Sequence, residues 1–63
     1  MINEFAAAMR KLLRDDMNNA TDDVATGSCR NFDDYKYVCG KIHGLAMAER
    51  HLLDLMEKVE RGE

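Results

Sequence analysis

The sequence lacks proline and tryptophan, and it holds only two phenylalanines and two tyrosines among its 63 residues. Proline interrupts helices, whereas aromatic and β-branched side chains favour strands, so this composition favours helices over a sheet. Cysteine is scarce as well. Two cysteines are too few for the disulfide network that stabilises many small secreted domains, and we expect both to be reduced.

Long apolar runs and an excess of basic residues are also missing. No stretch approaches the ~20 apolar residues of a membrane span, and charges interrupt the N-terminal segment too early for a signal peptide. The formal net charge is −3, whereas proteins that bind nucleic acids normally present a basic face. We therefore expect a soluble intracellular protein with no membrane partner, and a nucleic-acid partner is disfavoured.

One turn signal divides the chain. Gly27 suits the end of a helix, because glycine adopts the left-handed conformation cheaply, and Asn31 suits the N-cap of the next helix. Asp33 and Asp34 then place negative charge at the positive end of that helix dipole. The sequence predicts an all-α fold, a single antiparallel helical hairpin with a long C-terminal helix. The predicted elements are a helix at about 4–25, a turn at 26–31 and a helix at about 32–61.

The first helix is expected to begin near Glu4, with Asn3 as its cap. Its second half contains poor helix formers, and a break near Asn18–Asn19 is an alternative to a continuous helix. The continuous helix is favoured because the apolar residues keep helical spacing through this segment. The predicted apolar stripe consists of Phe5, Ala6, Met9, Leu12, Leu13, Met17, Ala20 and Val24.

The second helix has an apolar seam with one charged position. The seam alternates three-residue and four-residue spacing, as in coiled coils, over Tyr35, Val38, Ile42, Leu45, Leu52, Met56 and Val59. Position 49 falls in this series and is a glutamate. A carboxylate there needs a partner or an exit to water. Arg10 and Arg14 are candidate partners; the alternative is that Glu49 splays into solvent.

The opposite face of the second helix is unusual for a solvent-facing surface, which would normally hold Lys, Glu, Gln and Arg. It holds Tyr37, Gly40, Gly44, Met47, Ala48, His51 and Leu55, here called the glycine surface. Small residues at i and i+4 let another backbone approach closely. We interpret this surface as a protein interface; the alternative is that the glycines are tolerated surface positions. A lone hairpin has almost no interior, so oligomerisation or docking on a partner is expected to complete the fold.

Potential reactive groups do not form a recognisable site. Cys39 and His43 are four residues apart and could share a metal, or act as nucleophile and base. Zinc sites normally show a close cysteine pair or paired histidines, and a two-helix hairpin offers no pocket of the usual size. The aspartate pairs at 15–16, 22–23 and 33–34 lack the EF-hand pattern and are interpreted as helix caps and a solvated acidic end. We predict no catalytic, cofactor-binding or metal-binding residues and no enzyme activity.

The segment "DVATGSCRNFDDYKYVCGKIHGLAMAERHLLDLMEKVE" resembles a group of short, mostly uncharacterised helical proteins of tailed bacteriophages. The shared residues are the turn glycine, Asp34-Tyr35, Gly40, Ile42, Gly44-Leu45, Ala48-Glu49-Arg50 and Leu52-Leu53-Asp54-Leu55. The resemblance covers the turn and the second helix. It implies a phage protein made in a bacterial cytoplasm, encoded among virion genes, and it brings no catalytic residues.

Together, these features predict a small structural or interaction protein of a bacteriophage. In this hypothesis it is a minor virion component that docks on capsid or head-to-tail proteins through the glycine surface, or associates with itself. Its location would be the virion or the bacterial host cytoplasm. The alternative is an early phage regulator or inhibitor that binds a host protein.

Overall fold

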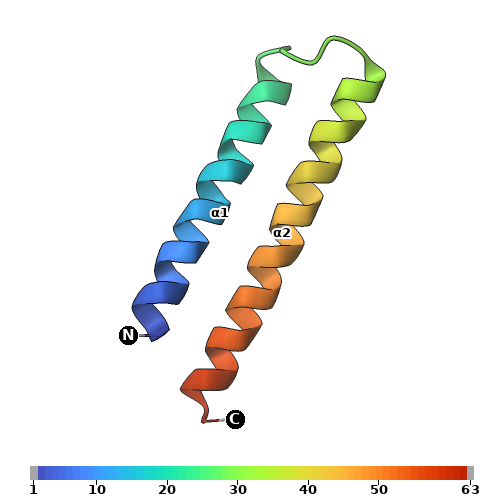
Figure 1. The fold of residues 1–63 in the computed structure, drawn as a ribbon. Helices are drawn as coiled ribbons and strands as arrows, with labels where there is room; N and C mark the ends of the chain where they lie inside the picture. Colours follow the sequence, from blue (N-terminus) through green and yellow to red (C-terminus); the bar gives the residue numbers. More distant parts are fainter. Residues whose placement is uncertain (1, 63) are drawn as a thin grey trace.

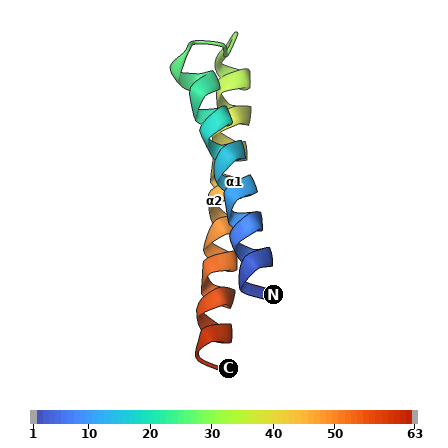
Figure 2. The same ribbon diagram turned by 90° about the vertical axis from the view of Figure 1, so that its left-hand side faces the viewer.

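The chain folds as two antiparallel helices, which lie side by side in the computed structural model (Figure 1). In the view turned by 90°, the first helix lies in front of the second (Figure 2). The structure describes residues 2–62. Helix α1 spans Ile2–Ala25, helix α2 spans Phe32–Glu60, and residues 26–31 connect them. The Cα atoms extend over 47 × 16 × 11 Å. The 29 residues of α2 account for most of the long dimension at about 1.5 Å per residue. The hairpin is therefore a single layer of helices.

The turn is held by the caps that its sequence predicts. Gly27 has a φ of +74°, and its N–H donates to the Val24 carbonyl, while the Ser28 N–H donates to the Asp23 carbonyl. This pair of bonds is a Schellman motif, which satisfies the last carbonyl groups of α1. At the start of α2, the Asn31 side chain accepts a hydrogen bond from the Asp34 N–H at 2.9 Å. Asn31 is thus the N-cap of α2, as predicted.

Helix α1 is continuous through Asn18 and Asn19, which confirms the favoured prediction over a break. Met17 and Ala20 are buried on either side of this pair, so packing against α2 supports a segment of low helix propensity. Thr21 Oγ1 donates to the Met17 carbonyl at 2.8 Å, so the hydroxyl is satisfied within the helix. The prediction for the N-terminal end was wrong: α1 begins at Ile2, and Asn3 lies inside the helix rather than capping it.

The interior is small and lies between the two helices. Four apolar side chains of α1 are buried, at successive spacings of seven, four and three residues: Ala6, Leu13, Met17 and Ala20. They face the half-buried seam residues of α2, which are Val38, Ile42, Leu45, Leu52 and Met56. The predicted seam is therefore present, although its end members Tyr35 and Val59 remain 44% and 46% exposed.

The predicted stripe of α1 is too wide. Phe5, Met9 and Leu12 belong to that stripe, yet they remain 74%, 44% and 62% exposed. They lie beside the buried stripe rather than in it, because a single partner helix covers only part of the apolar arc of α1. The hairpin alone therefore leaves a second apolar strip of α1 uncovered.

Candidate protein-interaction surface

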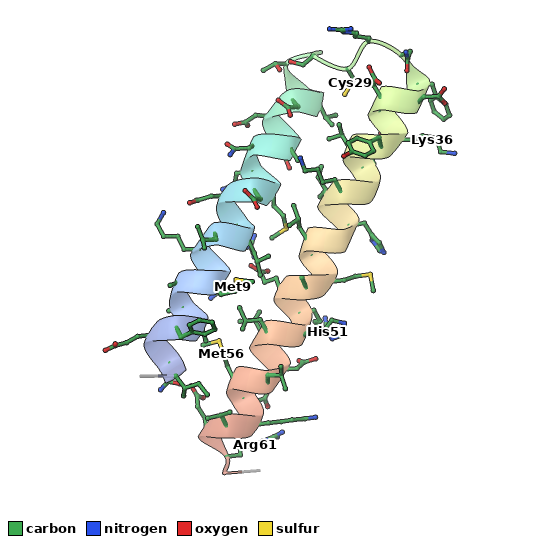
Figure 3. All side chains as sticks on the ribbon, in the orientation of Figure 1. Met9, Cys29, Lys36, His51, Met56 and Arg61 are labelled. Atoms are coloured by element: carbon green, nitrogen blue, oxygen red, sulfur yellow. The ribbon has the colours of Figure 1, made fainter. Side chains whose placement is uncertain are left out.

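All seven residues of the glycine surface lie on the exposed side of α2. Tyr37 is 73% exposed, Met47 51% and Leu55 59%, and these are large side chains for a solvent-facing position. His51 projects from the side of α2 that faces away from α1 (Figure 3). The helix periodicity therefore predicted the orientation of this surface, and α1 packs elsewhere.

Gly40 and Gly44 have no role in the hairpin that requires glycine. Positive φ among the described residues occurs at Gly27 and Gly62, so neither helical glycine needs its conformational freedom. A Cβ placed on Gly40 or on Gly44 meets no atom of another part of the chain within 4 Å. Each glycine costs helix stability of roughly 1 kcal/mol relative to alanine. Neither position therefore requires glycine for the structure of the hairpin itself.

Among the residues that the structure describes, Glu49 is the only charged one that is buried, at 8% exposure. The structure confirms Arg10 and Arg14 as its predicted partners. Its Oε2 atom lies 2.6 Å from Arg14 Nε and 3.7 Å from Arg10 Nε. Oε2 is fully shielded from solvent and accepts no well-directed hydrogen bond, so the contacts are ionic. The two arginine side chains remain 54% and 48% exposed, which leaves their guanidinium groups partly hydrated. Glu49 therefore points into the seam rather than into water.

The residues near the turn offer little chemistry. Cys29 and Cys39 are half-buried free thiols. A hydrogen bond with Cys39 raises the pKa of Tyr35 above its usual value. The negative charge of the Cys39 and Cys29 thiolates and partial burial of the phenol act in the same direction. Within residues 2–62, no group of three or more His, Cys, Asp or Glu side chains is arranged to hold a metal ion. Cys39 and His43 thus form no metal cluster in the described part of the chain.

Sequence reasoning missed a second exposed surface at the open end of the hairpin. Eight apolar residues make up this apolar face: Ile2, Phe5, Met9 and Leu12 of α1, and Leu52, Leu55, Met56 and Val59 of α2. Both helices contribute to an open groove of about 200 Å³ at this end. The signal was present in the sequence, because Ile2, Phe5, Met9 and Leu12 follow three-four-three spacing beside the buried stripe. The two stripes were read as one.

No known protein family, curated protein sequence or solved structure significantly matches the chain. Across the described residues, neither helix is long and apolar enough to cross a membrane.

Proposed function

We propose that the chain is a non-enzymatic protein-interaction module that docks on a larger protein through the glycine surface of α2. The observation that carries this proposal is the open space at Gly40 and Gly44. Small residues at positions 40, 44 and 48 form a smooth strip on which the backbone of a partner helix can lie closely. Tyr37 and Leu55, both well exposed, stand toward the two ends of the strip and supply apolar contact area.

The setting we propose is the virion of a tailed bacteriophage, with the chain as a minor component on capsid or head-to-tail proteins. The support for this setting is the resemblance of the turn and second helix to short phage proteins. That resemblance includes Gly40, Gly44 and Ala48, the three small residues of the strip. A docked accessory chain needs no catalytic group, and its own interior can remain small because the assembly buries its surface.

The experiment that tests the proposal is quantitative mass spectrometry of virions purified from the phage that encodes the chain. We expect a fixed copy number per virion for the wild type and loss of the protein from Gly44→Leu virions. Arg50→Leu is the matched control, because it adds the same side chain to another exposed position of α2 outside the glycine surface. Circular dichroism of the purified variants should show unchanged helix content, since nothing in the hairpin contacts position 44.

Two outcomes would contradict the proposal. Incorporation of Gly44→Leu at the wild-type copy number would show that the glycine surface is not the docking site. Absence of the wild-type protein from virions would reject the structural role and favour a regulator that acts on a host protein.

A further inference from the structure

The apolar face of the open end is a surface distinct from the glycine surface, with Leu55 as the one residue they share. On α1, Ile2 is 60% exposed, Phe5 74% and Leu12 62%. Met9, at 44% exposure, completes the strip, and it lies at the same end of the hairpin as Met56 in Figure 3. Contiguous apolar patches of this kind mark contact sites, whereas single exposed apolar residues need no explanation.

Residues of both helices form this face together. In an antiparallel pair, the strips that flank the seam on one side of α1 and of α2 lie next to each other. The groove confirms that the two strips are adjacent, because residues of both helices line it: Ile2, Phe5, Leu52, Leu55, Met56 and Val59. The eight residues of the face include no charged group. Two such faces can therefore meet without opposing like charges, although each chain carries a net charge of −3.

The exposed area of the chain indicates how much surface a partner would need to cover. A monomeric protein of 7.2 kDa is expected to expose about 4,100 Å². The hairpin exposes 5,114 Å², an excess of roughly 1,000 Å². A specific interface of standard size covers about 800 Å² on each partner. The excess therefore matches the area that one protomer of an ordinary dimer buries.

The shape of the hairpin favours a second copy as the partner. The Cα atoms are only 11 Å deep in the thinnest direction, which corresponds to one layer of helices, whereas stable domains pack at least two layers (Figure 2). The face also carries both an exposed aromatic ring, Phe5, and the groove that this ring helps to line. A surface with both features can pair with itself across a two-fold axis.

We propose that two copies of the chain pair through their apolar faces and form a four-helix bundle. The dimer does not depend on the proposed docking function, because different residues carry the two proposals apart from Leu55.

Analytical ultracentrifugation of the full-length chain tests the proposal. We expect a mass of twice 7.2 kDa for the wild type. Phe5→Glu and Leu12→Glu should each raise the dissociation constant at least a hundredfold, because a symmetric interface loses each side chain twice. Phe32→Glu is the matched control: Phe32 is 68% exposed, also stands in the first turn of its helix, and lies outside both surfaces. Its dissociation constant should stay within threefold of the wild-type value.

A second measurement covers the case in which the charged variants fail to fold. The melting temperature of the wild type should rise over a hundredfold range of protein concentration, since association stabilises the folded state by mass action. A monomeric mass with a constant melting temperature would overturn the dimer and leave the face to a different protein. Equal weakening by Phe32→Glu and Phe5→Glu would overturn the assigned interface. If Leu12→Glu loses the dimer but is still incorporated into virions at the normal level, the dimer is supported and docking does not depend on it.

Discussion

Replacing Gly40 and Gly44 with alanine should stabilise the isolated protein. Both residues lie inside α2 with ordinary helical backbone, and an added Cβ contacts no other part of the chain within 4 Å. Glycine in an exposed helix interior costs about 0.8–1.0 kcal/mol relative to alanine. The double variant should therefore gain about 2 kcal/mol in free energy of unfolding, because neither substitution has a steric cost within the hairpin. For a chain of this size, that gain corresponds to a rise in melting temperature of about 8–16 °C.

The assay is thermal and urea unfolding followed by circular dichroism at 222 nm, at one fixed protein concentration. Gly27→Ala is the matched control, because Gly27 has a φ of +74° that alanine adopts only at a cost of about 1–2 kcal/mol. The same chemical change should thus stabilise at positions 40 and 44 and destabilise at position 27. A double variant that is no more stable than the wild type would refute the reasoning. It would mean that the glycines serve the fold of the hairpin or of its dimer rather than an external partner.

Two further predictions concern the seam and the turn. Arg14→Met should lower the free energy of unfolding by about 2 kcal/mol in urea titrations, and Arg10→Met should lower it by less. The reason is that Glu49 Oε2 lies 2.6 Å from Arg14 Nε but 3.7 Å from Arg10 Nε. An equal loss in both variants would contradict this order. Cys39→Ala should lower the pKa of Tyr35 toward 10, measured by absorbance at 295 nm in a background where the other tyrosine is phenylalanine, because the hydrogen bond with Cys39 raises it. Since the folded-state pKa is raised, the contribution of Tyr35 to stability is complete below pH 10 and is lost as the pH rises through the raised value. An unchanged titration curve in Cys39→Ala would show that the thiol has no influence on the phenol.

Local signals predicted most of the fold. The turn combines a residue that favours positive φ, Gly27, with a strong N-cap, Asn31, and both act as their chemistry indicates. Helical periodicity also placed Glu49 in the seam, and charge complementarity then indicated its arginine partners. These inferences succeed because each depends on a few neighbouring residues or on the regular 3.6-residue repeat.

The division of α1 into a buried and an exposed stripe could not be predicted in the same way. Phe5 and Leu13 are both apolar, and periodicity alone does not say which of two adjacent stripes faces the second helix. The choice depends on how closely the helices approach. Ala6 and Ala20 are small residues that allow close approach, and both lie in the buried stripe. Phe5 lies beside this stripe and is 74% exposed. The function of the exposed stripes is a property of surfaces between chains, which a single sequence encodes only indirectly.

The buried carboxylate of Glu49 also bears on the fidelity of folding. Helix α1 carries two adjacent apolar strips, and a rotation of α1 about its own axis could turn Phe5 and Leu12 toward α2 in place of the buried strip. Such a rotation would carry the guanidinium groups of Arg10 and Arg14 away from Glu49 and leave a buried charge unpaired, at a cost of about 3–5 kcal/mol. The two ionic contacts thus disfavour rotated hairpins more than they stabilise the native one. They keep Phe5 and Leu12 on the outside of α1, at fixed positions relative to the exposed residues of α2.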